Sequence, residues 1–91
     1  MERKRNKLEI IKDILTVIRE KNGRIKPTHI LYKSNLSHQM MKEYLEELIV
    51  KKVIKEIELK QGKTYEVTPK GINYLEEYNT IVNFTNAFGL D

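Results

Sequence analysis

Three stretches of the chain place apolar residues three or four positions apart, which is the spacing of one helix face. In the first stretch these residues are Leu8, Ile11, Ile14, Leu15 and Ile18. Asn22-Gly23 is typical of a helix end, because glycine readily adopts the left-handed conformation that follows a last turn. The pattern predicts a helix over residues 7–22, followed by a short extended piece at 24–26.

Two further helices are predicted between residues 27 and 51. Pro27 suits the first turn of a helix over 27–34, because its missing N–H would be unpaired there anyway. Ser37 is a good N-cap for a helix over 38–51. The apolar stripe of this third helix is Met41, Tyr44, Leu45, Leu48 and Ile49.

The apolar period then changes to two. Residues 53–59 and 63–67 alternate apolar with polar side chains, although the alternation is imperfect at Glu56. Gly62 lies between them and can supply the positive φ of a hairpin turn. Thr68 and Pro69 follow as an N-cap and a first helical residue, so a last helix is predicted over 69–88.

This order of elements predicts an α+β, mostly helical fold. Two helices joined by a turn and followed by a two-stranded wing form a winged helix-turn-helix domain. We expect this domain, with a basic N-terminal arm, to occupy residues 1–68. A long C-terminal dimerisation helix is expected over 69–91.

Composition narrows the class of protein. The 91 residues suit one domain, and the mix of 40% hydrophobic with 33% charged residues is that of a folded, well-solvated chain. The chain has no cysteine, which excludes disulfides and thiolate metal sites. No apolar run is long enough to span a membrane, and no apolar segment follows the basic N-terminus as in a signal peptide. We therefore expect a cytoplasmic protein.

The charge is unevenly distributed. The net charge is +4, but residues 1–30 hold nine Lys/Arg and four Asp/Glu, whereas residues 64–91 hold one and four. This asymmetry indicates that one end of the molecule faces an anion. Ordinary Lys/Glu surface decoration, as in thermophile proteins, is the alternative explanation.

Two segments resemble a known group of proteins: YKSNLSHQMMKEYLEELIVKKVI, residues 32–54, and YEVTPKGINYLEEY, residues 65–78. They are similar to archaeal winged-helix DNA-binding proteins of the 10a chromatin-associated group and to related predicted transcriptional regulators. The resemblance implies a dimer in which the last helix pairs with its copy as an antiparallel coiled coil and the two winged domains bind DNA. The last helix here departs from that pattern in length, and Asn79 and Asn83 interrupt its heptads.

The first turns of the third predicted helix carry the main candidates for DNA contact. Recognition helices present their N-terminal residues to bases; Gln can pair with adenine, and Lys with guanine or phosphate. On a helical wheel Gln39 and Lys42 face outward together, and His38 lies at the edge. The helix start at Ser37 favours a phosphate. Glu46, on the same face, would accept from cytosine or lie beyond the groove, and solvated surface is the alternative for each residue.

The other candidates lie at the wing tip, in the basic arm and in the second helix: Lys60, Gln61, Lys63, Arg3, Arg5 and Lys33. Lysines at a wing tip suit phosphate, although they also deter strand pairing between molecules. The arm would order along phosphates, or it would be a disordered solubility tail.

Signals for an enzyme are weak. His29 and His38 are the only histidines and have no carboxylate partner at ligand spacing. The QGK sequence lacks the second glycine and the following helix of a phosphate loop. We expect no catalysis, no metal and no cofactor, and nothing in the sequence indicates a small-molecule ligand.

The last predicted helix has more apolar surface than docking on a small domain requires. A monomer rarely exposes so large an apolar patch, and buried aromatic residues dominate interface energetics. We predict a homodimer that uses Leu75, Tyr78, Ile81, Val82, Phe84 and Phe88.

The sequence therefore predicts a homodimeric transcriptional regulator, or an architectural nucleoid-associated protein, that binds double-stranded DNA. The main alternative is a winged-helix module that binds another polypeptide, which the glutamates of the third helix and the modest net charge support. RNA binding is disfavoured, because the basic side lacks a platform of exposed aromatic residues.

Overall fold

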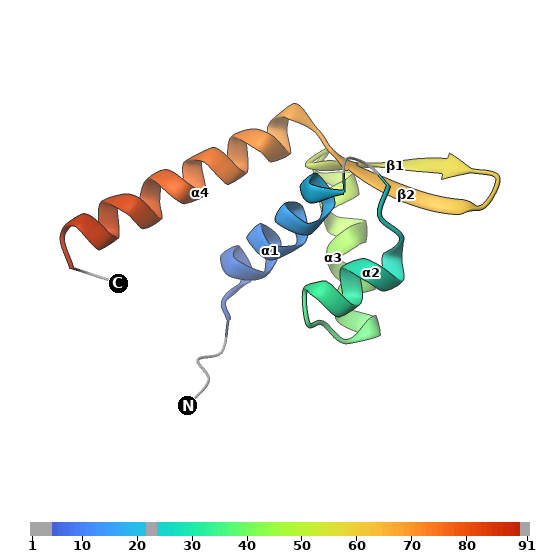
Figure 1. Cartoon of the computed structure of the whole chain (residues 1–91), viewed down its shortest axis with the longest axis horizontal. Coiled ribbons are helices and arrows are strands. Elements are labelled where there is room, and N and C mark those ends of the chain that lie inside the picture. Colours follow the sequence, from blue (N-terminus) through green and yellow to red (C-terminus); the bar gives the residue numbers. More distant parts are fainter. Residues whose placement is uncertain (1–4, 22–23, 90–91) are drawn as a thin grey trace.

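The computed structural model describes residues 5–21 and 24–89. Within these ranges the chain forms, in order, α1 (Lys7–Glu20), α2 (Pro27–Lys33), α3 (His38–Val50), β1 (Ile54–Leu59), β2 (Gly62–Val67) and α4 (Pro69–Ala87). Figure 1 shows α1, α2 and α3 as a helical body, with the β1–β2 hairpin projecting on one side and α4 on the other. The predicted α+β, mostly helical winged helix-turn-helix architecture is confirmed.

The helices end one or two residues earlier than predicted. Their last residues are Lys33, Val50 and Ala87 in α2, α3 and α4, and Glu20 in α1. Assigned helix ends commonly differ by this much, because last turns fray. The predicted helix end at residues 22–23 lies outside the described part of the chain.

Polar caps start three of the helices. The side chains of Ser37 and Thr68 accept the backbone N–H three residues later, as predicted, and a proline fills the first position of α2 and of α4. The cap of α1 was not foreseen: Asn6 accepts the backbone N–H of Glu9, whose carboxylate accepts the N–H of Asn6. This reciprocal capping box satisfies two backbone donors that would otherwise be unpaired.

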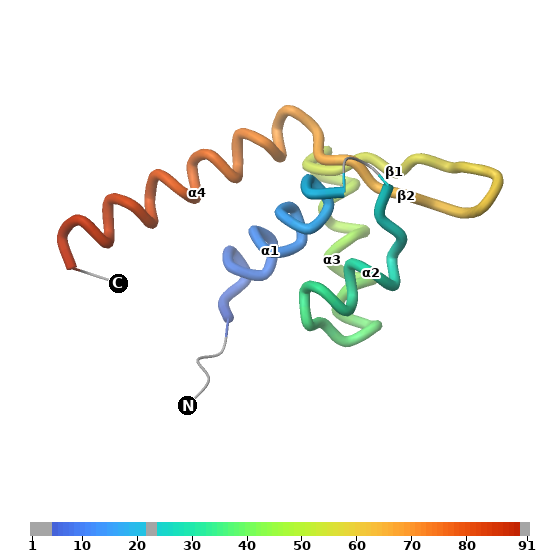
Figure 2. The backbone as a smooth tube through the Cα atoms, viewed as in Figure 1, coloured from blue at the N-terminus to red at the C-terminus, as the bar shows by residue number. Residues whose placement is uncertain are grey.

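The two strands pair antiparallel along their whole length and end with Leu59 opposite Gly62. Gly62 has a φ of +133°, a conformation that favours glycine, so its predicted place in the turn is confirmed. Figure 2 shows residues 24–26, which lead into α2, running past the base of the hairpin, where Ile25 forms an isolated bridge to Tyr65. The predicted extended piece at 24–26 thus ties the hairpin to the helical body.

The core fills the space between the helical body and the base of the hairpin. Its most deeply buried apolar side chains are Ile14, Leu15, Ile18, Ile25, Ile30 and Ile54. Leu75 joins this cluster from α4, and α3 contributes Met41, Leu45 and Leu48. Removing these side chains from water is the main force that holds the helices and the hairpin together.

Leu8, the first residue of the apolar pattern in α1, is 56% exposed. Ile10 and Val17, which were not assigned to the stripe, are buried instead. The reason is that α1 contacts α4 and β2 as well as α2, so its buried surface is wider than one helical stripe.

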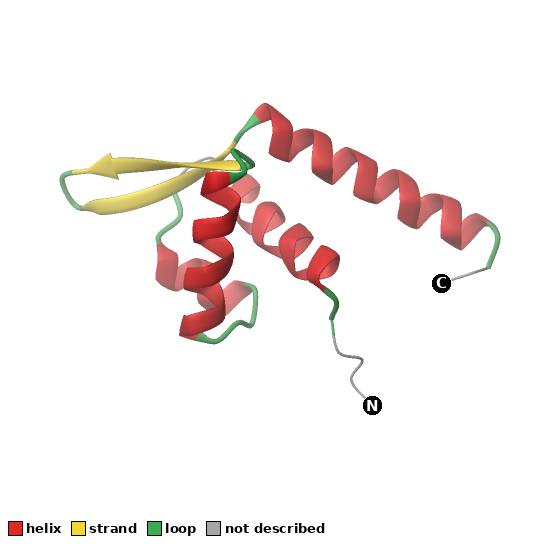
Figure 3. Cartoon of the chain, turned by 180° about the vertical axis from the view of Figure 1, so that it is seen from behind, coloured by secondary structure: helices red, strands yellow, loops and turns green. Residues whose placement is uncertain are grey.

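The two halves of α4 differ in their surroundings. Gly71 and Leu75 are buried, and Tyr74 and Tyr78 are half-buried against α1, whereas nearly every residue after Tyr78 is exposed. Figure 3 shows the end of α4 extending well beyond the helical body. None of the helices in residues 5–21 and 24–89 is both long and apolar enough to span a membrane.

The close packing of Gly71 yields a test of this arrangement. A Cβ there would overlap the carbonyl oxygen of Val53 and lie 2.5 Å from Cγ1 of Val67. We expect Gly71→Ala to lower the free energy of unfolding by about 1–3 kcal/mol, measured by urea unfolding, because α4 must move away from the hairpin. The control is Asn73→Ala, at an exposed position of the same helix, which should change stability by less than about 0.5 kcal/mol. Wild-type stability of Gly71→Ala would contradict the close approach.

Candidate nucleic-acid interface

The exposed side of α3 and the hairpin line a common groove of about 220 Å³. His38, Lys42 and Glu46, one turn apart, form the α3 wall, and Glu56 and Lys63 come from the hairpin. The remaining lining residues are mostly apolar and come from α3, the hairpin and the start of α2: Met41, Leu45, Ile49, Tyr65 and Pro27. The helix predicted to read DNA and the predicted wing therefore face the same space.

The groove carries both signs of charge. Lys42 has no ion-pair partner among the described residues, while Lys63 Nζ lies 3.4 Å from Glu56 Oε1. Both members of this pair are exposed to solvent, so the pair is weak and can be exchanged for a phosphate. Glu46 is the one carboxylate on the α3 wall of the groove.

Gln39 is exposed but does not line this groove. Its Nε2 donates to Glu43 Oε1 at 2.9 Å, on the next turn of α3. The sequence predicted that Gln39 and Lys42 face outward together, and the structure divides them: Lys42 lies on the hairpin side, and Gln39 pairs along the helix. The amide oxygen of Gln39 has no partner in the described part of the chain.

The glutamates of α3 have separate surroundings. Glu47 Oε1 lies 2.8 Å from Lys7 Nζ of α1, and this hydrogen bond raises the pKa of Lys7 above its ordinary value. Glu43 is engaged by Gln39. Two of the three carboxylates of α3 therefore have partners within the chain, outside the groove.

The wing tip and α2 place their candidates at the surface. Lys60 and Gln61 are exposed at the hairpin turn, and Lys33 is exposed in the last turn of α2, outside the groove. Sequence reasoning missed Arg24 and Lys26, which lie beside the hairpin in a second cavity that Gln61 and Lys63 also line. The alternation of Arg24, Ile25 and Lys26 could have indicated them, because a buried Ile25 in an extended segment leaves the side chains on either side of it exposed.

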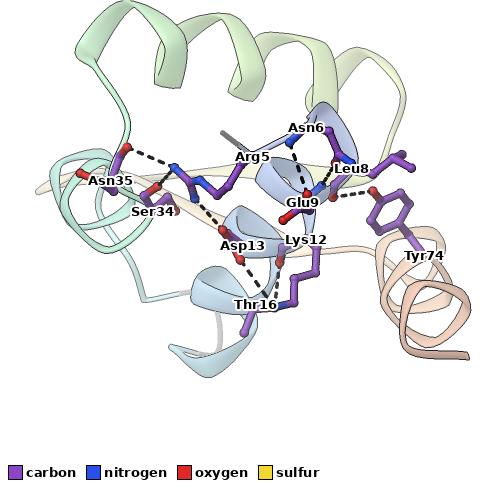
Figure 4. Close-up of polar contacts among 10 residues, drawn as sticks. All are labelled: Arg5, Asn6, Leu8, Glu9, Lys12, Asp13, Thr16, Ser34, Asn35 and Tyr74. Atoms are coloured by element: carbon purple, nitrogen blue, oxygen red, sulfur yellow. Dashed lines mark hydrogen bonds and ion pairs between the residues drawn. The ribbon is translucent and has the colours of Figure 1, made fainter. Parts of the chain in front are cut away.

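Arg5 has partners within the chain (Figure 4). Its guanidinium pairs with Asp13 Oδ2 at 2.5 Å and donates to the backbone carbonyls of Ser34 at 2.7 Å and Asn35 at 3.2 Å. It thereby connects α1 to the α2–α3 turn. Arg3, the other DNA-binding candidate of the predicted arm, lies outside the described residues.

The six residues predicted for dimerisation fall into two groups. Leu75 is buried in the core of its own chain, and Tyr78 is half-buried, with Lys12 Nζ 6.0 Å from its ring centroid. Figure 4 shows the neighbouring Tyr74 donating its hydroxyl to the carbonyl of Leu8, so the start of α4 is fastened to α1. The other four are exposed large hydrophobic residues: Ile81, Val82, Phe84 and Phe88.

Within residues 5–21 and 24–89, no three His, Asp or Glu side chains gather closely enough to hold a metal ion. The arrangement offers cations, hydrogen-bonding groups and a groove beside a helix, which are the means of recognising an extended anion.

Comparisons with known proteins agree with the fold. A family model described as winged helix-turn-helix matches residues 4–86. Among solved structures, that of Sso10a-2, a DNA-binding protein from Sulfolobus solfataricus, matches with a TM-score of 0.78 and 20% sequence identity. The match covers 92% of this chain and 85% of that chain. A search of curated proteins finds no match.

The contacts of Arg5 predict a structural role. We expect Arg5→Ala to lower the free energy of unfolding by about 1–2 kcal/mol, because two backbone carbonyls and Asp13 lose a partly buried charged donor. Lys33→Ala is the matched control, since it removes an equal charge from an exposed position with no partner in the described chain. Chemical denaturation at low salt measures both, and equal stabilities would contradict the bridging role of Arg5.

Proposed function

Because the chain belongs to the winged helix-turn-helix family, we propose that it binds double-stranded DNA as a homodimer that regulates transcription or organises the chromosome. The observation that carries this proposal is the groove shared by α3 and the hairpin, with His38, Lys42 and Lys63 on its walls. The structural neighbour is itself described as a DNA-binding protein, which supports the same conclusion.

In the proposed complex α3 enters the major groove with its first turns leading. His38 and Lys42 then approach base edges or phosphates, and the first turn of α3, capped by Ser37, lies near the backbone. The hairpin extends along the adjacent backbone, where Lys60 and Gln61 contact phosphates. Lys63 exchanges its exposed pairing with Glu56 for a phosphate oxygen.

Glu46 supplies discrimination in this complex. A carboxylate facing the groove can accept a hydrogen bond from the amino group of cytosine, and it repels phosphate. Sequence selectivity therefore depends on the balance between Lys42 and Glu46, four residues apart on the same wall of the groove. The modest net charge is compatible with binding, because Lys42 in the groove and Arg24 and Lys26 beside the hairpin form no ion pair in the described part of the chain.

The second half of α4 supports the proposed homodimer. Ile81, Phe84 and Phe88 recur at helical spacing and are 62–65% exposed, and the rings of Phe84 and Phe88 lie 4.8 Å apart. Two copies of this half pairing antiparallel as a short coiled coil would bury the stripe and place the winged domains at opposite ends. Leu75 stays in the core of its own chain, so the dimer contact begins near Tyr78.

Charge removal in the groove tests DNA binding. We expect Lys42→Ala and Lys63→Ala each to weaken binding to duplex DNA, and each lost phosphate contact to reduce the slope of log K against log salt by about 0.9. The matched control is Arg19→Ala on the α4 side of α1, which removes one positive charge away from the groove. Fluorescence anisotropy at several salt concentrations provides the measurement. Salt-independent binding, or groove variants equal to wild type, would overturn the proposed interface.

The dimer has an independent test. We expect the wild-type chain to sediment as a dimer at micromolar concentration and the double variant Phe84→Ser/Phe88→Ser to sediment as a monomer, because the exposed stripe loses its largest apolar side chains. Val50→Ser is the control, since Val50 is 77% exposed but lies at the end of α3. A monomeric wild type would refute the dimer without bearing on whether one domain binds DNA.

A further inference from the structure

A cavity of about 510 Å³ lies where the hairpin passes the segment that leads into α2. Arg24 and Lys26 line it from that segment, Thr28 from the start of α2, and Leu59 and Thr64 from the hairpin, among others. Small-molecule sites in proteins typically measure about 300–1,000 Å³ and are mostly apolar with a few polar groups. This cavity fits that description in both size and lining.

The apolar wall of this cavity, formed by Leu59 and Pro27, is not part of the buried core that holds the fold together. Leu59 is 52% exposed near the end of a hairpin whose tip is otherwise polar, and it stays outside the buried core. The ring of Pro27 continues the same surface. A DNA backbone would use the nearby cations but would leave this apolar wall unused.

The charges around the cavity share one sign. Arg24, Lys26 and Lys63 line it, and no Asp or Glu is among its lining residues. Lys63 is partly neutralised by Glu56, whereas Arg24 and Lys26 form no ion pair in the described part of the chain. The occupant that complements these groups is an anion with an apolar body.

Thr64 lines the cavity and holds a buried hydroxyl behind its wall. It is only 7% exposed, and its hydroxyl has no hydrogen-bond partner among the described residues. Buried hydroxyls are normally paired, and a hydroxyl can donate to a carboxylate oxygen. A bound acid can supply the missing acceptor after a rotation of the threonine side chain.

We propose that this cavity binds a small amphipathic carboxylate, with its head group between Arg24 and Lys26 and its apolar body against Leu59 and Pro27. Gln61 and Lys63 line the same cavity, so the ligand occupies part of the wing surface. Weaker DNA binding in the presence of the ligand follows from this overlap and rests on the proposed function.

A titration of the full chain with 4-phenylbutyrate tests the site in the absence of DNA. Amide shifts in ¹H–¹⁵N spectra are expected to cluster at residues 24–28 and 59–64, with saturation at millimolar concentrations. The uncharged analogue 4-phenylbutyramide is expected to bind at least about tenfold more weakly, because it cannot pair with the two cations. Shifts that are absent or scattered, or equal binding of acid and amide, overturn the proposal.

Matched variants separate each feature of the site. Leu59→Ser is expected to weaken 4-phenylbutyrate binding about tenfold by removing the apolar wall, whereas Leu8→Ser, at a similarly exposed leucine outside the cavity, is expected to have no effect. Arg24→Ala and Arg19→Ala form the corresponding pair for charge.

If the cavity accommodates only the sugar-phosphate backbone of DNA, the chain will bind duplex DNA, but 4-phenylbutyrate will cause no amide shifts. That outcome refutes the ligand site and leaves the DNA proposal standing. If the chain fails to bind DNA, the shifts still decide whether the ligand site exists.

Discussion

The geometry of the molecule depends on the contact between the first turn of α4 and the turn that follows α3. The Thr68 hydroxyl lies 2.6 Å from the carbonyl oxygen of Lys52 and 2.9 Å from that of Val53, and the Thr68 N–H donates to Val53 as well. Gly71 makes room for this approach, because any side chain there would meet Val53. Lys52, in the same turn, adopts a positive φ of +61°. The end of α3, both ends of the hairpin and the start of α4 meet at this junction, so it sets the angle of the wing to α3 and the direction in which α4 leaves.

The distribution of cations follows from that arrangement. Arg5 and Lys7 have partners within the chain, since they connect α1 to the α2–α3 turn and to α3. Lys42, Arg24 and Lys26 have no ion-pair partner in the described part of the chain and face the space around the hairpin. A positive net charge alone does not distinguish the two sets. The intramolecular pairs stabilise the helical body, and the unpaired cations near the wing define the surface that an anion would meet.

The two halves of α4 differ in their contacts, although both contain apolar residues. Its first half completes the core through Leu75 and contacts α1 through Tyr74, whose hydroxyl donates to the carbonyl oxygen of Leu8. Burial raises the pKa of the Tyr74 hydroxyl above its ordinary value. Its second half contacts little of its own chain and exposes Phe84 and Phe88. The core therefore extends past residue 68, where the last helix begins, because Leu75 of α4 packs in it.

The order of helices and strands could be predicted from sequence because each depends on local chemistry. Ser37 and Thr68 cap helices whatever lies around them, Gly62 permits the hairpin turn, and the change from helical spacing to alternation marks the wing. The exposure of His38, Gln39 and Lys42 was visible in the same way, from the position of each residue around α3.

Which residues meet was decided only by the tertiary structure, because contacts between elements depend on how those elements pack. The sequence predicts Arg5 as part of a basic arm, whereas in the structure its guanidinium donates to two backbone carbonyls of the α2–α3 turn. The sequence predicts Leu75 as an interface residue, whereas in the structure it packs in the core of its own chain. Arg24 and Lys26 lie beside the hairpin because Ile25, between them, forms a bridge to Tyr65. The sequence by itself determined the order of the helices and strands and the exposure of the first turns of α3. The division of charges and apolar side chains between the core, the groove and the free surface arose when α4 and the hairpin packed against α1 and α3.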